Sequence, residues 1–138
     1  MHGDKAYLEA SHRTQDLLNI KWALRSVGYS IGSSWHDTEA NTGTAFKDHW
    51  NARGLEQLQF CDCLIVISGT RGEAAPELAM MAGFALARGI RLFWIGAPFR
   101  GLSDFRAATQ FDSAESFQKE LLSTAHSKPV WASKQQAA

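Results

Sequence analysis

The chain has 138 residues, which is the size of one domain built around one hydrophobic core. Hydrophobic residues make up 45% of it and charged residues 20%, a composition typical of globular proteins and not of disordered ones. The 14 lysines and arginines balance the 14 aspartates and glutamates, so the net charge gives no sign of binding to nucleic acid or to an anionic membrane.

The longest apolar run, Cys63 to Ile67, is far too short to cross a bilayer, and the first residues lack the basic and then apolar order of a signal peptide. The two cysteines, Cys61 and Cys63, stand too close together for an ordinary disulfide framework, which indicates a reducing compartment. They also lack a third and a fourth ligand at the usual spacing. We therefore expect a cytoplasmic protein with no metal and no cofactor.

The first half of the chain predicts two strands and a helix. Lys5 to Glu9 is a short apolar segment and predicts the first strand. Apolar residues at helical spacing predict a helix from about Thr14, and Gly28 is suited to end it. Tyr29 to Trp35 predicts the second strand, and the polar segment from His36 to Thr44 predicts a loop.

The middle of the chain holds the clearest strand and the clearest helix. Phe46 to Phe60 predicts a helix that leads into the strand Cys63 to Ser68. This strand is apolar on both faces, as a central strand of a parallel sheet must be. Glu73 to Arg88 predicts the next helix, with Pro76 suited to its first turn and Gly89 to the position just past its end.

Arg91 to Ile95 predicts a fourth strand, Thr109 to Phe111 a short fifth, and Ser113 is suited to cap a last helix. Alternating strands and helices imply an α/β fold, with a doubly wound, Rossmann- or flavodoxin-like parallel sheet of four to five strands and helices on both faces. We expect residues 1–127 to form this single domain and residues 128–138 to be a loosely ordered tail.

In such a sheet, ligands bind at the carboxyl ends of the strands, where the strand order reverses. If the order is 2-1-3-4-5, the reversal lies between the first strand and the third. The loop Ala10 to Arg13 then lies beside the segment Ser68 to Glu77, which follows the most apolar strand. We therefore expect a ligand site at this edge, centred on Ser68 to Glu77.

The segment after the third strand combines residues suited to a ligand: Ser68, Gly69, Thr70 and Arg71, with Glu77 at the start of the next helix. Small residues let the backbone approach a ligand, and the helix end offers free N–H groups. The alternative is a capped loop with a solvated Arg71. Glu77 is either an ordinary carboxylate in a first helical turn or a nucleophile or base that faces the crevice.

The segment after the first strand carries Ser11, His12 and Arg13. A hydroxyl and a guanidinium at a strand-to-helix turn are suited to bind phosphate or carboxylate, although Ser11 as a helix cap and Arg13 in solvent is the alternative. His12 is suited to titrate near neutral pH, and a surface histidine is its simpler interpretation. Trp35 ends the second strand at the same edge, where it either stacks on a base or is a core or lid tryptophan.

Three segments together resemble a known family: Lys5 to Arg13, Leu55 to Val66, and Gly83 to Gly89. They are similar to the first strand and phosphate loop, to the approach to the third strand, and to the Gly-x-Ala-x-x-x-Gly pattern of the nucleoside 2-deoxyribosyltransferase superfamily, which includes the deoxynucleoside 5′-monophosphate N-glycosidases. The resemblance spans roughly Tyr7 to Phe111. It adds Tyr7 to the expected ligand-binding residues.

The resemblance implies that Glu77 attacks the anomeric carbon of a nucleoside or nucleoside 5′-monophosphate. The base leaves through an oxocarbenium-like transition state, and water or a second base takes the sugar. Ser11 and Arg13 would hold the phosphate, with Ser68 and Thr70 adding hydroxyls. The family also implies a homodimer or a larger homo-oligomer.

Two positions depart from the family. If the two family glycines are matched strictly, the catalytic Glu falls on Met81, four residues after Glu77 and so one helical turn away. The family's Asp, eight residues before the position of Asp62, falls on Gly54, which leaves three other acidic residues as candidates for its role: Asp37, Glu39 and Asp48. These departures favour the alternative of a catalytically inactive nucleotide-binding or sensing module. A pure interaction domain is the third possibility.

Overall fold

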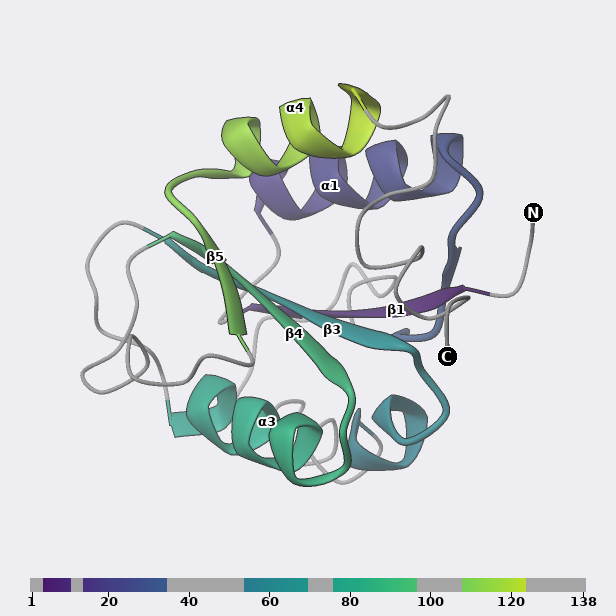
Figure 1. The fold of residues 1–138 in the computed structure, drawn as a ribbon, viewed down its shortest axis with the longest axis vertical. Helices are drawn as coiled ribbons and strands as arrows, with labels where there is room; N and C mark the ends of the chain where they lie inside the picture. Colours follow the sequence, from purple (N-terminus) through teal and green to yellow (C-terminus); the bar gives the residue numbers. More distant parts are fainter. Residues whose placement is uncertain (1–3, 11–13, 35–53, 70–75, 97–107, 124–138) are drawn as a thin grey trace.

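The structure is a computed structural model that describes residues 4–10, 14–34, 54–69, 76–96 and 108–123. The predicted α/β fold is confirmed, because five parallel strands form one sheet in the order β2-β1-β3-β4-β5 (Figure 1). The strands are β1 (Lys5–Ala10), β2 (Ser30–Ile31), β3 (Cys63–Gly69), β4 (Arg91–Gly96) and β5 (Ala108–Phe111). The helices are α1 (Gln15–Ser26), α3 (Pro76–Ala87) and α4 (Ala114–Ser123), together with helical residues 54–58.

Helices cover both faces of the sheet. α1 and α4 lie side by side on one face, whereas α3 and helical residues 54–58 lie on the other (Figure 1). The strand order reverses between the neighbouring strands β1 and β3, as the sequence predicts. Because α1 follows β1 on one face and α3 follows β3 on the other, the chain leaves these two strands in opposite directions.

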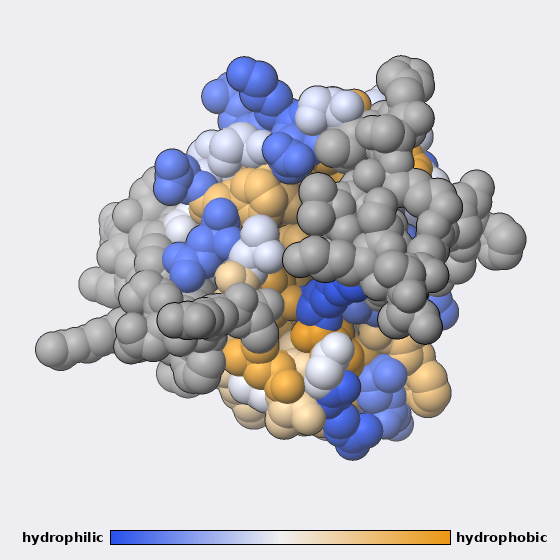
Figure 2. All heavy atoms as spheres, in the orientation of Figure 1, coloured by the Kyte–Doolittle hydropathy of each residue, from blue (hydrophilic) through white to orange (hydrophobic). Residues whose placement is uncertain are grey.

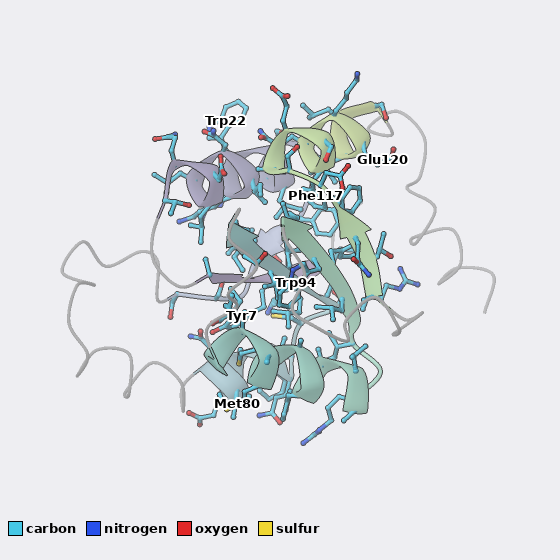
Figure 3. The ribbon with its side chains drawn as sticks, turned by 90° about the vertical axis from the view of Figure 1, so that its left-hand side faces the viewer. Tyr7, Trp22, Met80, Trp94, Phe117 and Glu120 are labelled. Carbon is cyan, nitrogen blue, oxygen red and sulfur yellow. The ribbon has the colours of Figure 1, made fainter. Side chains whose placement is uncertain are left out.

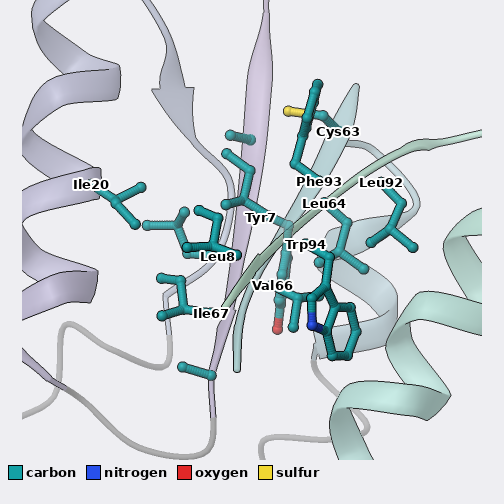
Figure 4. Packing of buried hydrophobic residues seen from close by; sticks show 14 of the residues in the cluster. Tyr7, Leu8, Ile20, Cys63, Leu64, Val66, Ile67, Leu92, Phe93 and Trp94 are labelled. Atoms are coloured by element: carbon teal, nitrogen blue, oxygen red, sulfur yellow. The ribbon is translucent and has the colours of Figure 1, made fainter. Parts of the chain in front are cut away.

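The core lies on both sides of β1, β3 and β4. Leu8 of β1 points toward Ile20 of α1, and Tyr7, Val66 and Trp94 point to the opposite face, which α3 covers (Figure 4). All five side chains are buried. Each side chain of this size contributes about 1.5–3 kcal/mol by leaving water, so this two-sided burial is what holds the sheet between its helices.

Two glycines end helices as the sequence predicts. Gly28 follows α1 with a φ of 103°, and Gly89 follows α3 with a φ of 73°, a backbone conformation that other residues rarely adopt. The start of α1 differs from one interpretation of the sequence, in which Ser11 caps this helix. The backbone N–H of Leu17 donates to Oγ1 of Thr14 at 3.3 Å. Thr14 therefore caps α1, the role that this interpretation gave to Ser11.

The second strand is much shorter than predicted. After Gly32, whose N–H donates to the carbonyl of Ala6 at 2.8 Å, a side chain replaces the backbone ladder: Oγ of Ser33 accepts the N–H of Leu8 at 3.0 Å. A Cβ at Gly32 would lie 2.5 Å from Sγ of Cys61, so only glycine fits beside β1 there. The small residues of this segment thus end regular pairing early.

The last helix begins as predicted. The N–H of Ser116 donates to Oγ of Ser113 at 3.1 Å, which caps α4. Phe117 and Leu121 are buried, and Phe117 packs edge-on against Phe111 with 5.1 Å between ring centroids. Leu122, next to Leu121 in α4, is exposed.

The outer surface differs between the two helical layers. In the view of Figure 2, hydrophilic residues gather over the layer of α1 and α4, whereas the layer of α3 shows more apolar residues. Trp22 on α1 and Met80 on α3 are the exposed apolar side chains labelled in Figure 3. Within the described residues, no helix has both the length and the apolar character to cross a membrane.

The amino edge of the sheet carries a structural carboxylate. Asp62 precedes β3, and its Oδ2 accepts the N–H of Lys5 at 2.7 Å, which ties the start of β1 to the turn before β3. The N–H of Asp62 donates in return to the carbonyl of Lys5 at 2.8 Å. Asp62 therefore ties the start of β1 to the start of β3 at the edge opposite the expected ligand site.

Asp4→Asn is expected to raise the melting temperature at about pH 7 and to have little effect at about pH 3. Burial raises the pKa of Asp4 above 3.8, the neighbouring Asp62 raises it further, and Arg91 opposes them. A pKa raised by folding means that stability is full below the ordinary pKa and falls as pH rises through the folded value. Asparagine removes that loss. Thermal unfolding by circular dichroism at both pH values checks this, and a lower melting temperature at pH 7 would contradict it.

Candidate functional site

The candidate site is built from the carboxyl ends of β1 and β3. These strands are hydrogen-bonded neighbours in parallel register, and Ala10 at the end of β1 lies opposite Ile67. Both strands therefore end at the same edge of the sheet, where the chain turns to opposite faces. The predicted meeting of the two strand ends is confirmed. The loops themselves, residues 11–13 and 70–75, lie outside the described residues.

Ser68 is half-buried near the end of β3. Its Oγ accepts the Nε1–H of Trp94 at 3.1 Å and donates to the carbonyl of Ile95 at 3.3 Å. These bonds fasten the end of β3 to β4. Gly69 follows at a shift in register between Ile67 and Gly69, and it pairs with Gly96. The third strand thus ends on a small residue beside another small residue, which leaves the backbone open to close approach.

Tyr7 is fully buried, and its hydroxyl lies against helical residue Gly54. A Cβ built on Gly54 would lie 2.5 Å from Oη of Tyr7 and 3.6 Å from Cε of Met81. Positions 54 and 81 are those at which the family resemblance, aligned strictly, expects an Asp and a Glu. The structure brings both positions to one place, and the phenol of Tyr7 and the thioether of Met81 fill it.

Glu77 is the second residue of α3, one turn before Met81. It lies in the first helical turn, as predicted, and Pro76 begins the helix. Because α3 follows β3, its first turn is its nearest part to the carboxyl edge of the sheet. The strict family alignment expects the Glu at position 81. Glu77 lies about 6 Å along the helix axis from that position, which is about one turn nearer to the carboxyl edge.

The sequence interpretation missed Glu9. This residue is 0% exposed and lies in β1 opposite Val66 of β3. Side chains alternate along a strand, so Glu9 shares the face of Tyr7, which α3 covers. Glutamate is almost never fully buried unless it is paired. A charged residue two positions after Tyr7 in an otherwise apolar strand was the available signal.

Six of the predicted ligand-binding residues lie outside the described residues: Ser11, His12, Arg13, Trp35, Thr70 and Arg71. The same holds for the three acidic residues considered in place of the family's Asp, which are Asp37, Glu39 and Asp48. Their predicted roles stay predictions.

Burial disfavours thiolate chemistry at the two cysteines. Burial raises the pKa of the Cys61 thiol to about 11, and its Sγ donates to the carbonyl of Gln57 at 3.4 Å. Burial also raises the pKa of the Cys63 thiol. Since the thiolate is the nucleophile, a raised pKa keeps both groups in the less reactive thiol form near neutral pH. Among the described residues, no group of three or more histidine, cysteine or acidic side chains is placed to hold a metal ion.

A scan against models of known protein families and a search of curated proteins each found no match to this chain. The resemblance to the nucleoside 2-deoxyribosyltransferases therefore stays a prediction from the sequence motifs.

Proposed function

We propose that the protein is a nucleoside or nucleoside 5′-monophosphate N-glycosidase or deoxyribosyltransferase that uses Glu77 as its nucleophile. The observation that carries this proposal is the position of Glu77 in the first turn of α3, at the edge where β1 and β3 end together. Proteins with an open parallel sheet bind their ligands at the carboxyl ends of the strands, and Glu77 belongs to the helical turn nearest to this edge.

In the proposed reaction, a carboxylate oxygen of Glu77 forms a bond to C1′ of the sugar. The C1′–N bond breaks, and its electron pair leaves with the base, which takes up a proton. Water or a second base then attacks C1′ and gives up a proton, which balances the proton taken up by the first base; the C1′–O bond to Glu77 breaks, and the carboxylate is restored. The negative charge of Glu77 also stabilises the positive charge that develops on the sugar ring.

The substrate is a small nucleoside or nucleotide, with no cofactor. We assign the phosphate to Ser11, His12 and Arg13, on the basis of their residue types after β1. Trp35 is suited to stack on the base, and the segment Ser68 to Arg71 to contact the sugar. We further propose a cytoplasmic homodimer or larger homo-oligomer. The two free, buried thiols support a reducing compartment.

One observation favours a second candidate, an inactive nucleotide-binding or sensing module. The two positions that carry acids in the resembled family are Gly54 and Met81 here, and both are buried beside Tyr7. A chain that has lost both acids while keeping the ligand edge would bind a nucleotide without cleaving it.

We expect the purified protein to release free base from at least one member of a panel of nucleosides, deoxynucleosides, their monophosphates and NAD. Chromatography of the reaction measures the release, and Glu77→Ala should abolish it. Ligand-induced thermal stabilisation without release would support the binding module instead. No release and no stabilisation with any of these compounds would exclude both.

A further inference from the structure

The outward side of α3 lacks the polar residues that are exposed on the other helices. Between Leu78 and Ala87, no residue of this helix carries a charge, a hydroxyl group or a side-chain amide. By contrast, α1 and α4 expose charged residues such as Asp16 and Lys119. Met80 of α3 is 43% exposed, and Figure 3 shows it on the side of the helix that faces away from the sheet. A helix that is apolar all round is normally buried, so we expect another molecule to cover this side of α3.

A ridge and a groove lie side by side on this face of α3, because residues four apart align along a helix. The ridge consists of Met80 and Phe84, and Arg88 continues it, with its guanidinium 5.0 Å from the centre of the Phe84 ring. The groove consists of three small residues at the same spacing: Ala79, Gly83 and Ala87. In the commonest contact between helices, ridges of this spacing pack into grooves of the same spacing.

Gly83 indicates that a neighbour approaches the groove closely. Glycine inside a helix costs about 1 kcal/mol relative to alanine. Among the described residues, nothing lies within 4 Å of a Cβ at Gly83, and this glycine does not have a positive φ. Neither a contact within the chain nor the backbone conformation therefore requires glycine here. The missing side chain instead allows the backbone of a second helix to lie close against α3.

We propose that two copies of the chain associate through this face of α3, with the ridge of each copy in the groove of the other. A second copy fits because ridge and groove lie on one face and run in the same direction, so a two-fold axis places each opposite the other. Residues 78–87 carry no charge, so two identical faces meet without repulsion between like charges. The inference rests on the proposed function only for the expectation of a homo-oligomer, to which it adds the contact surface.

The size of this face sets the strength of the association. α3 has 12 residues and is therefore about 18 Å long, and a helix is about 10 Å wide. Such a strip is well below the roughly 800 Å² that each partner buries in a standard interface. A contact of this size is typical of weak, reversible association. We therefore expect an equilibrium between monomer and dimer that depends on the protein concentration.

The test is analytical ultracentrifugation of the full chain, without substrate, over a dilution series. The wild type is expected to form dimers at the highest concentration and to dissociate on dilution. Gly83→Glu should stay monomeric throughout, because it fills the groove and places two carboxylates near the two-fold axis. The matched control is Trp22→Glu, which puts the same charge at an exposed apolar residue of the opposite layer and should associate like the wild type.

Thermal unfolding by circular dichroism checks the fold of each variant. Gly83→Glu is expected to fold, because nothing lies within 4 Å of a Cβ at this position. Met80→Glu is a second variant on the same face, at a residue that is already exposed, and it should also be monomeric.

Three results would overturn the inference. One is a wild type that stays monomeric at every concentration, which would leave this face to a different partner. Another is an assembly that Gly83→Glu and Met80→Glu leave intact. The third is an assembly that Trp22→Glu alone disrupts, which would assign the contact to α1. Base release is measured separately with the substrate panel, so failure of this inference is distinguishable from failure of the proposed enzyme.

Discussion

Gly54→Ala is expected to lower the free energy of unfolding by about 1–3 kcal/mol, the usual cost of overpacking a core. The new methyl group would lie 2.5 Å from Oη of Tyr7 and 3.6 Å from Cε of Met81. Tyr7 cannot swing aside, because its ring is fully buried in the central strand. The clash therefore outweighs the gain of up to about 1 kcal/mol that alanine brings to a helix. Urea unfolding of the purified variant measures the change.

Tyr7→Phe removes the atom that clashes, so the double variant Gly54→Ala/Tyr7→Phe should recover most of the loss relative to Tyr7→Phe alone. The matched control is Gly83→Ala in α3, where a Cβ would meet nothing within 4 Å. This control should be neutral or stabilising, since a helix favours alanine over glycine. An unchanged stability in Gly54→Ala, or equal losses with and without the tyrosine hydroxyl, would contradict the account of this contact.

The same contact bears on position 54, where the sequence resemblance predicts an Asp. An Asp at position 54 needs the space that the Tyr7 hydroxyl occupies, so the two groups exclude each other. A return to the family pattern by Gly54→Asp alone should therefore destabilise the fold. Among the described residues, Glu9 of β1 is an acidic side chain on the same face of the sheet as Tyr7.

Glu77→Gln is expected to lower kcat/KM for base release on the order of 10³-fold or more, because the amide has no charge with which to attack C1′. The substitution keeps the size of the side chain, so the melting temperature should change little. Glu73→Gln is the matched control, since it removes a second carboxylate from the same segment of sequence. Equal losses in the two variants, or full activity in Glu77→Gln, would contradict the assignment of the nucleophile.

Much of the fold follows from local sequence signals. The apolar strand from Cys63 predicted the centre of the sheet, and Gly28 and Gly89 predicted two helix ends, because these features depend on a few neighbouring residues. The strand order followed from alternation of strands and helices, which leaves few topologies for a chain of this length. The edge that carries the candidate site was predictable for the same reason.

Contacts between distant residues were not predictable in this way. The early end of β2 depends on Ser33 bonding to Leu8, 25 residues away. The need for a glycine at position 54 follows from its contact with the Tyr7 hydroxyl, and Tyr7 lies 47 residues away in the sequence. The burial of Glu9 depends on the packing of α3 against β1. No pattern within the strand predicts which helix covers the face that carries Glu9.

The central claim is that Glu77 forms a covalent bond to the sugar. A nucleoside with a 2-deoxy-2-fluoro sugar slows formation and breakdown of the glycosyl-enzyme, because fluorine destabilises the positive charge on the ring. After incubation and digestion with trypsin, tandem mass spectrometry of the peptide Gly72 to Arg88 locates any attached sugar. The account predicts one fluorosugar on Glu77. Base release with an unmodified peptide, or a sugar on Glu73, would contradict it.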